Sequence, residues 1–415
     1  MDQMFGANMG GWGQRSRWGA LGAAALLWAG GCAGGPRGAP VTAVSSTPRP
    51  AEVRFRPADP PPGHDARLVG AIPNARWDAG LDRAAEELVA RMAGRDARLE
   101  PRLTSRVLSM VGYPAQVRTF TLINGGAFPE ALIEELINVG EGDPVDIGLG
   151  QRCWGDGLCL WRVAAGVARA SADPMPRDLP IDGTLSVRVD TDRLGELRLF
   201  LAGPDGPVEE LEMSPGVSRH VDRFHGPGEY RVEVVADHRG VAQVLLLFSV
   251  FVETPVPDPG RLAVRDLPPP DPVLAEAELY DALNAVRAAH GLRPVQPFAL
   301  FETPAREHSA LMAAAGAVRH RLPGRPGGVP EAATNLALPR ANFFENVAAA
   351  YTADEAAALV EGSPGHLRNL LCEPCTHASI GVALEPVLSR TPRLFVTWEL
   401  LEFPQGQPLR IIRER

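Results

Sequence analysis

Apolar side chains recur at helical spacing in three stretches of the chain. The first follows Asp78, a residue type favoured at helix N-caps, and its apolar positions are Leu81, Ala84, Ala85, Leu88 and Met92. Two similar stretches cover residues 275–291 and 305–315. A period near 3.6 residues gathers these side chains on one face, so the pattern predicts amphipathic helices in all three, with a shorter helix at 131–137.

Apolar and polar residues alternate in the middle of the chain, as they do in half-buried strands. The alternating segments are 185–189, 197–201 and 228–234. Strands about ten residues apart with turn signals between them predict an all-β sandwich over residues 178–253. The Pro-Asp-Gly turn at 204–206, followed by a G-x-Y-x-V strand, resembles immunoglobulin-like modules of bacterial surface proteins, which space or present other domains.

Two proline-rich stretches divide the chain into folded parts. Residues 33–75 are rich in Pro, Gly, Ala and Ser and are predicted to be a flexible linker, and residues 254–272 are predicted to be a stiff one. Between them, residues 77–175 combine helices with two short apolar runs that suggest a hairpin, which predicts a small α+β domain before the β-sandwich. The chain is therefore expected to be multidomain, with its last domain at 273–403.

The first 32 residues have the organisation of a lipoprotein signal peptide. Arg15 and Arg17 precede an apolar stretch too short for a membrane span, and small residues lead to Cys32. This arrangement resembles the bacterial lipobox, which implies lipidation of Cys32 and attachment to a membrane through the lipid. Plain cleavage with an unmodified Cys32 is the alternative, because Ala29 stands where the lipobox usually has Leu. Ala33 resembles the outer-membrane sorting pattern, so we expect an exported lipoprotein of the outer membrane or cell surface.

The four remaining cysteines form two pairs close in sequence, Cys153 with Cys159 and Cys372 with Cys375. In the oxidising compartment that export implies, close pairs are typical of local disulfides. A shared zinc site is the alternative, but the pairs lie in different predicted domains and the first has the wrong spacing for a zinc knuckle. We therefore predict two disulfides.

Composition argues against several activities. The net charge is −9 without a long basic run, so nucleic-acid binding is not expected. All 41 basic residues are arginine, which excludes a P-loop, a Schiff-base lysine and a Ser–Lys dyad. The sequence also lacks H-E-x-x-H and G-x-S-x-G motifs. An enzyme is therefore a weaker expectation than a binding or structural protein.

Six segments of the last domain resemble, in the same order, motifs of the CAP superfamily (cysteine-rich secretory proteins, antigen 5 and pathogenesis-related proteins), in particular its SCP-like bacterial members. They are Leu283-Asn284-x-x-Arg287 with Gly291-Leu292-x-Pro294, His308-Ser309-x-x-Met312-Ala313 with His320 after it, Glu345-Asn346-Val347-Ala348, Ser363-Pro364-Gly365-His366-x-x-Asn369-Leu370-Leu371, Thr376-His377-x-x-Ile380-Gly381-Val382, and Leu394-Phe395-Val396-Thr397-Trp398. Phe344 and Val360 depart from the family's Gly and Trp and are expected to change the walls of its cleft, so the identity of the ligand is not transferred.

The resemblance implies an α/β/α sandwich in which two histidines and one glutamate converge in an open cleft. Carried over, they are His320, Glu345 and His366. Imidazoles with a carboxylate suit a divalent metal such as zinc, and the same groups could polarise a water or accept a proton. The alternative is a cluster that only ties core loops together. Glu361 is a candidate for the second glutamate that many members have.

The neighbouring polar residues have structural interpretations. Asn346, Ser363 and Asn369 are predicted to hold loops and cap helices. His308 and His377 are interpreted as a helix histidine and a strand-end histidine satisfied by hydrogen bonds.

Three functions follow, and we rank them in order. The first is a binding module of the cell envelope that takes a metal ion or a small apolar or lipid-like ligand. The second is a structural protein that binds an envelope protein or glycan, and the third is a metal-assisted hydrolase. A further hypothesis concerns residues 77–175. Their helix and their Asp146-Ile147-Gly148-Leu149-Gly150 run are similar to the helix and the Ile380-Gly381-Val382 strand of the last domain, so they would be a degenerate CAP-like copy without the His and Glu cluster.

Overall fold

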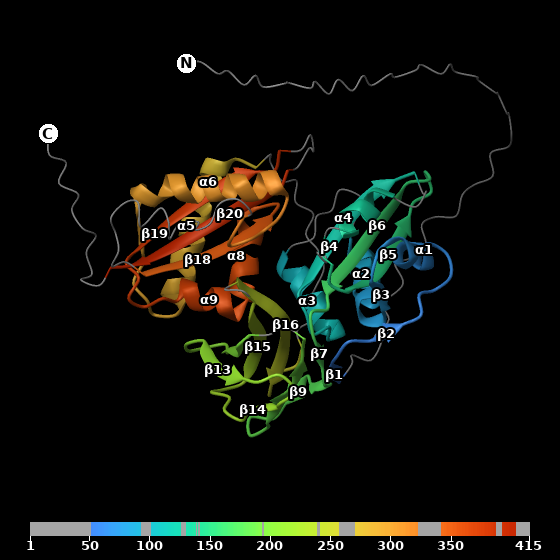
Figure 1. Cartoon of the computed structure of the whole chain (residues 1–415), viewed down its shortest axis with the longest axis horizontal. Helices are drawn as coiled ribbons and strands as arrows, with labels where there is room; N and C mark the ends of the chain where they lie inside the picture. Colours follow the sequence, from blue (N-terminus) through green and yellow to red (C-terminus); the bar gives the residue numbers. More distant parts are fainter. Residues whose placement is uncertain are drawn as a thin grey trace, which may run out of the picture. The chain divides into compact units, whose positions relative to one another are not determined.

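The chain forms a mixed α+β structure with several separate sheets (Figure 1). The computed structural model describes residues 51–92, 101–125, 130–137, 139, 142–192, 195–238, 241–256, 270–322, 342–386 and 392–403. All of these belong to one compact unit, Arg49–Arg415. The predicted signal peptide with Cys32, and most of the linker predicted at 254–272, lie outside the described residues.

The first domain is a five-stranded sheet with helices on both faces. Its strands, in the spatial order β2-β3-β5-β6-β4, are Pro57–Ala58, Ala75–Asp78, Val145–Cys153, Cys159–Val167 and Val117–Asn124. Helices α2 (Ala79–Arg91) and α3 (Pro101–Val111) pack on one face, and α1 (His64–Ala71) and α4 (Glu130–Ile137) on the other.

Two local predictions for this domain are confirmed. Helix α2 begins after Asp78, because the Asp78 carboxylate accepts hydrogen bonds from the backbone N–H groups of Gly80 and Leu81. The two apolar runs form the β5–β6 hairpin, which the Cys153–Cys159 disulfide closes.

The prediction of a flexible linker is wrong for its last part. Residues 52–72 contain β1 (Glu52–Val53), β2 and α1. The reason is local burial, because Val53 lies in the core of the middle domain while Leu68 and Ile72 lie in that of the first. A few well-placed apolar side chains hold a stretch whose average composition is that of a linker.

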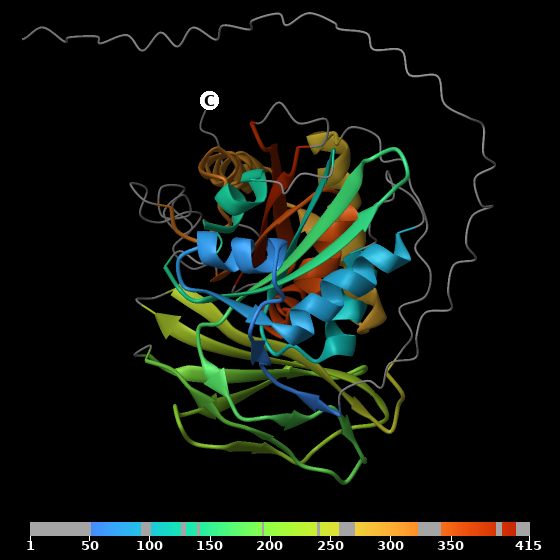
Figure 2. The same ribbon diagram turned by 90° about the vertical axis from the view of Figure 1, so that its right-hand side faces the viewer.

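The middle domain, as far as it is described, consists of strands and turns. Its main sheet, in the order β13-β12-β15-β16-β9, comprises Glu209–Met213, Leu197–Ala202, Gly228–His238, Val241–Val252 and Asp178–Leu179. The strands lie in two layers (Figure 2), and the second layer contains three two-stranded pairs: β10 (Leu185–Val187) with β14 (Arg219–Val221), β11 (Val189–Asp190) with β7 (Ser171–Ala172), and β1 with β8 (Met175–Pro176). Because Val53 and Met175 belong to the shared core, this domain extends beyond 178–253.

The last domain is a four-stranded sheet between helices. Its strands, in the order β17-β19-β20-β18, are Gln296–Pro297, His377–Leu384, Leu394–Glu402 and Asn342–Ala350. Helix α6 (Ala299–Ala315) covers one face, and α5 (Pro272–Ala289) and α8 (Ala353–Gly362) cover the other. Helix α9 (Pro364–Leu370) follows α8 directly.

The first and last domains share one sheet topology. In each, the first strand runs parallel to the third, the third antiparallel to the fourth, and the fourth antiparallel to the second, which gives β3-β5-β6-β4 and β17-β19-β20-β18. A glycine of the third strand lets a helix approach closely in both. A Cβ on Gly148 would lie 2.0 Å from the Asp82 nitrogen in α2, and one on Gly381 would lie 2.2 Å from the Arg306 nitrogen in α6.

Candidate functional site

Glu345, which lies on β18, is the centre of a cluster of ionisable side chains. One of its carboxylate oxygens lies 2.7 Å from Nδ1 of His320, and the other lies 3.2 Å from Nδ1 of His308. His308 belongs to α6, and His320 follows the end of that helix. Because the β18–β20 register pairs Glu345 with Glu399, a second carboxyl group lies directly beside the first.

The two carboxyl groups have opposite protonation preferences. Burial alone would raise the pKa of Glu345, but the contacts of its carboxylate with His308 and His320, together with the neighbouring Glu399, outweigh it and lower that pKa to about 2. Burial and the neighbouring Glu345 charge raise the pKa of Glu399 well above its ordinary value. When the pair holds a single proton, that proton is therefore on Glu399 and the negative charge is on Glu345.

His366 completes the predicted trio from helix α9. Its ring centre lies 6.4 Å from that of His320. Burial, and secondarily the neighbouring His320, lower the pKa of His366 to about 4. The His366 imidazole is therefore neutral at physiological pH. The structure thus brings His320, Glu345 and His366 together and adds His308 and Glu399. We call these five residues the His/Glu cluster.

A network of capping side chains fixes α9 against β18. The Ser363 hydroxyl accepts a hydrogen bond from the backbone N–H of His366, which confirms its predicted capping role. The Asn346 side chain donates to the His366 carbonyl at 3.0 Å. Asn369 donates to the Asn346 side chain at 2.8 Å and to the Glu345 carbonyl at 3.2 Å. The two asparagines thus hold backbone in place, as predicted.

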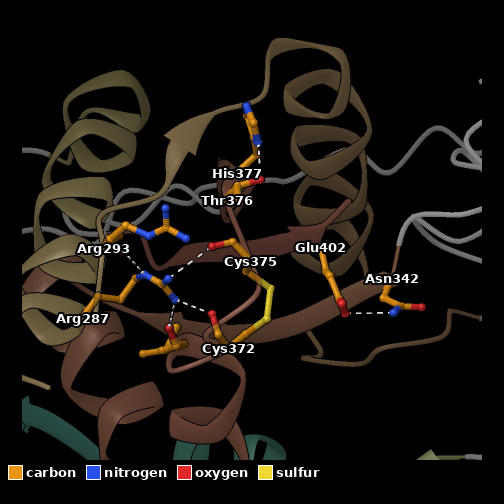
Figure 3. The surroundings of a disulfide bond; sticks show 9 residues. Arg287, Arg293, Asn342, Cys372, Cys375, Thr376, His377 and Glu402 are labelled. Atoms are coloured by element: carbon orange, nitrogen blue, oxygen red, sulfur yellow. Dashed lines mark hydrogen bonds between the residues drawn. A yellow bond between two sulfur atoms is a disulfide. The ribbon is translucent and has the colours of Figure 1, made fainter. Parts of the chain in front are cut away.

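The other end of α9 is held by a buried arginine and a disulfide (Figure 3). The Arg287 guanidinium donates to the carbonyl oxygens of Leu370, Cys372 and Cys375 at 2.8, 2.9 and 3.3 Å. The Cys372–Cys375 disulfide closes the same loop and confirms the second predicted pair. Arg287 of α5 therefore stabilises the segment that carries His366.

Several predicted neighbours do not join the cluster. Nδ1 of His377 forms a hydrogen bond of 2.8 Å with the Thr376 hydroxyl. The His377 ring packs edge-on against Phe298 and Phe403, in agreement with its structural interpretation. Glu361, the candidate second glutamate, offers its backbone carbonyl to Arg231 of the middle domain. The carboxyl group beside Glu345 belongs to Glu399 instead.

The two departures from the family pattern lie away from the cluster. Phe344 and Val360 pack in the core between the sheet, α5 and α8. Successive residues of a strand point to opposite faces, so Phe344 faces away from the side to which Glu345 points. The expectation that both substitutions change the cleft walls is therefore wrong.

Sequence reasoning missed Glu399 and gave His308 a purely structural role. The sequence does contain a signal for Glu399, because a glutamate interrupts the apolar end of the run Leu394–Leu401. In the structure this glutamate is fully buried. Its partner could not be inferred, since that depends on the register between β18 and β20, which pairs Glu399 with Glu345, 54 positions earlier in the chain.

The cluster suits a divalent metal in its chemistry but only in part in its geometry. An ionised Glu345 and a neutral His366 are in the protonation states of metal ligands. Yet the described residues contain no group of three or more potential ligands arranged around one point. Both oxygens of Glu345 already contact histidine nitrogens, so an ion would have to replace these contacts.

No protein-family model matches the sequence, and no curated protein matches it. Similar solved structures include an extracellular protein containing a SCP domain from Bacillus anthracis (16% identity, TM-score 0.27, covering 53% of this chain and 82% of that one). They also include a cysteine-rich secretory protein from Staphylococcus aureus (12%, TM-score 0.26, 65% and 89%) and an outer surface protein from Borrelia burgdorferi (17%, TM-score 0.26, 31% and 92%). The helices in the described part of the chain are not long and apolar enough to cross a membrane.

Proposed function

We propose that this protein is an exported lipoprotein of the bacterial envelope whose last domain has the CAP fold and binds a ligand, a divalent metal ion first of all, at the His/Glu cluster. The signal-peptide pattern ending at Cys32 and the two disulfides support export. The six ordered motifs support the fold, together with a four-stranded sheet that has α6 on one face and α5 and α8 on the other.

The observation that carries the proposal is the gathering of four other ionisable side chains with Glu345 in the His/Glu cluster. Burying such groups costs free energy unless each finds a partner. The pairing here is incomplete, since among the described residues the buried Nε2 of His308 has no hydrogen-bond partner. Costly and incompletely paired clusters with shifted pKa values are typical of functional sites.

Two alternatives remain weaker. A structural protein is supported by the asparagine network, but that network holds backbone and does not require the histidines. A metal-assisted hydrolase would use the same His320, Glu345 and His366. Ser363 does not serve it as a nucleophile, because its hydroxyl donates to Glu233 and accepts from backbone, so no imidazole activates it.

The first domain fits the same proposal as a copy of the last one without a site. The glycines Gly148 and Gly381 pair with Ala164 and Thr397 at equivalent places in the two sheets. Two positions further along, Glu399 corresponds to Gly166, and its partner Glu345 corresponds to Val117. The shared topology supports duplication, and the lost carboxyl groups assign the binding role to the last domain alone.

The middle domain is assigned to the immunoglobulin-like sandwiches, on the support of its two strand layers around one apolar core. In this proposal it joins the two related domains.

Calorimetric titration of residues 49–415 with zinc tests the function. We expect micromolar or tighter binding in the wild type and its loss in His320→Ala/His366→Ala, because both imidazoles would be ligands. The matched control is His225→Ala/His290→Ala, which removes two histidines away from the cluster.

Equal binding by the wild type and His320→Ala/His366→Ala would refute the metal site. Absence of binding in every variant would also refute it, and the same proteins would then be titrated with lipid vesicles. Turnover of a casein or ester panel that disappears in His366→Ala would favour the hydrolase.

A further inference from the structure

A buried glutamate of the middle domain faces the last domain. Glu233 lies on β15 between Val232 and Val234, which point into the core of the middle domain, so its side chain points outward. An outward-facing carboxylate is normally hydrated, but Glu233 is only 1% exposed. Something other than water must therefore satisfy its oxygens.

The first turn of α9 provides these partners. One oxygen of Glu233 accepts a hydrogen bond from the Ser363 hydroxyl at 2.8 Å, and the other accepts one from the backbone N–H of Gly365. Ser363 is the N-cap of α9 and Gly365 its second residue. The two hydrogen bonds tie the first turn of α9 to β15 and satisfy both oxygens of the buried Glu233 side chain.

These contacts lead directly to His366. The Ser363 hydroxyl that donates to Glu233 also accepts from the His366 N–H, and Gly365 precedes His366 in the chain. A Cβ on Gly365 would lie 2.9 Å from the Glu233 carboxylate, so a side chain there would displace that carboxylate. The Ser363-Pro364-Gly365-His366 segment thus contacts Glu233 through both Ser363 and Gly365.

More exposed contacts surround this buried one. Arg368, two residues after His366, forms an ion pair of 2.7 Å with Glu210 of β13, and its side chain is 50% exposed. Arg231 donates to the Glu361 carbonyl at 2.9 Å. An exposed ion pair contributes little stability, so among the contacts between α9 and the middle domain those of Glu233 contribute most.

We propose that Glu233 is a positioning residue for the His/Glu cluster, and that the middle domain sets the orientation of His366 by holding the first turn of α9. The effect on ligand binding rests on the function proposed above, whereas the effect on the placement of His366 does not. In this interpretation the middle domain is part of the site and not only a spacer.

The test compares Glu233→Ala, Glu233→Gln and the control Glu210→Ala in residues 49–415. Two properties are measured: the NMR signals of the His366 imidazole, assigned with His366→Gln, and zinc affinity by calorimetry. The glutamine variant should rescue, because its amide can accept from Gly365 and donate to Ser363. Glu210→Ala removes a contact between the same two domains without touching the first turn of α9.

We expect Glu233→Ala to shift or broaden the His366 signals and to weaken zinc binding about 10-fold or more, as loss of supporting contacts does at metal sites. Glu233→Gln and Glu210→Ala should stay close to the wild type. His366 signals unchanged in folded Glu233→Ala, or an equal change in Glu210→Ala, would overturn the proposal.

A second variant keeps the test decisive if Glu233→Ala does not fold. Gly365→Ala presses a methyl group against the Glu233 carboxylate and should disturb the same His366 signals. Gly362→Ala is its control, because a Cβ at Gly362 meets nothing within 4 Å. If the wild type binds no zinc, the function above fails, yet the His366 signals still decide whether Glu233 positions that residue.

Discussion

At the scale of single residues, Asp82 shows how a buried carboxylate makes stability depend on pH. Asp82 lies on α2 and accepts a hydrogen bond from the Leu149 N–H. Burial, with the nearby Glu86 charge, raises its pKa from 3.8 to about 6. The folded state therefore binds more protons than the unfolded state between these values, and stability falls as the pH rises through about 6.

Replacing Asp82 by Asn removes this cost and keeps the acceptor for Leu149. We expect Asp82→Asn to raise the free energy of unfolding by about 1 kcal/mol at pH 7.5, after allowance for partial exposure. The gain should disappear below about pH 4, where the carboxyl group is neutral in both states. Urea unfolding at the two pH values measures the difference, and an equal gain at both would contradict the assignment.

The residues of the site divide into those that local motifs reveal and those that only the fold reveals. His320, Glu345 and His366 lie in recognisable segments, so their convergence could be predicted. Glu399 and Glu233 could not be, because the partner of Glu399 depends on strand register and that of Glu233 on a contact between domains 130 positions apart in sequence.

At the scale of elements, helix α6 and strand β19 approach closely because Gly381 has no side chain. A Cβ on Gly381 would lie 2.2 Å from backbone atoms of Ala305 and Arg306, which no rotamer change can relieve. We expect Gly381→Ala to lower the free energy of unfolding by about 3 kcal/mol, since α6 or the strand must shift. Gly362→Ala is the control, because a Cβ there meets nothing within 4 Å. Thermal unfolding of both variants measures the effect, and equal melting temperatures would refute this packing argument.

Elements whose apolar residues recur at regular spacing could be predicted from the sequence, and elements that depend on tertiary contacts could not. Helix α2 and the β5–β6 hairpin follow from spacing and capping alone. Helix α6 begins at Ala299 and not at the predicted residue 305. It includes Pro304, a residue type that normally argues against a helix interior, so the first turn could not be predicted from the sequence. The small elements β1 and α1 exist because neighbouring cores bury a few of their side chains.

At the scale of the whole molecule, contacts between domains are the least predictable feature, and they decide how the described unit unfolds. Arg177 precedes β9 and is completely buried. Its guanidinium donates to the Met110 carbonyl of α3 and lies 5.8 Å from the centre of the Phe251 ring in β16. A backbone hydrogen bond of 2.8 Å from Leu247 to Pro114 joins the same two domains.

These contacts predict that the first and middle domains unfold together. Arg177→Met keeps an apolar stem near Phe251 but leaves the Met110 carbonyl without its charged donor, a loss of about 2 kcal/mol. In residues 49–415 we expect scanning calorimetry to show a lower melting temperature and a separation of the two domains' transitions, because the coupling between them is weakened. Arg67→Met is the matched control, since Arg67 is 55% exposed and its ion pair with Glu130 lies on the surface. A single transition in Arg177→Met at the temperature of Arg67→Met would mean that backbone contacts alone couple the domains, and that the buried arginine does not.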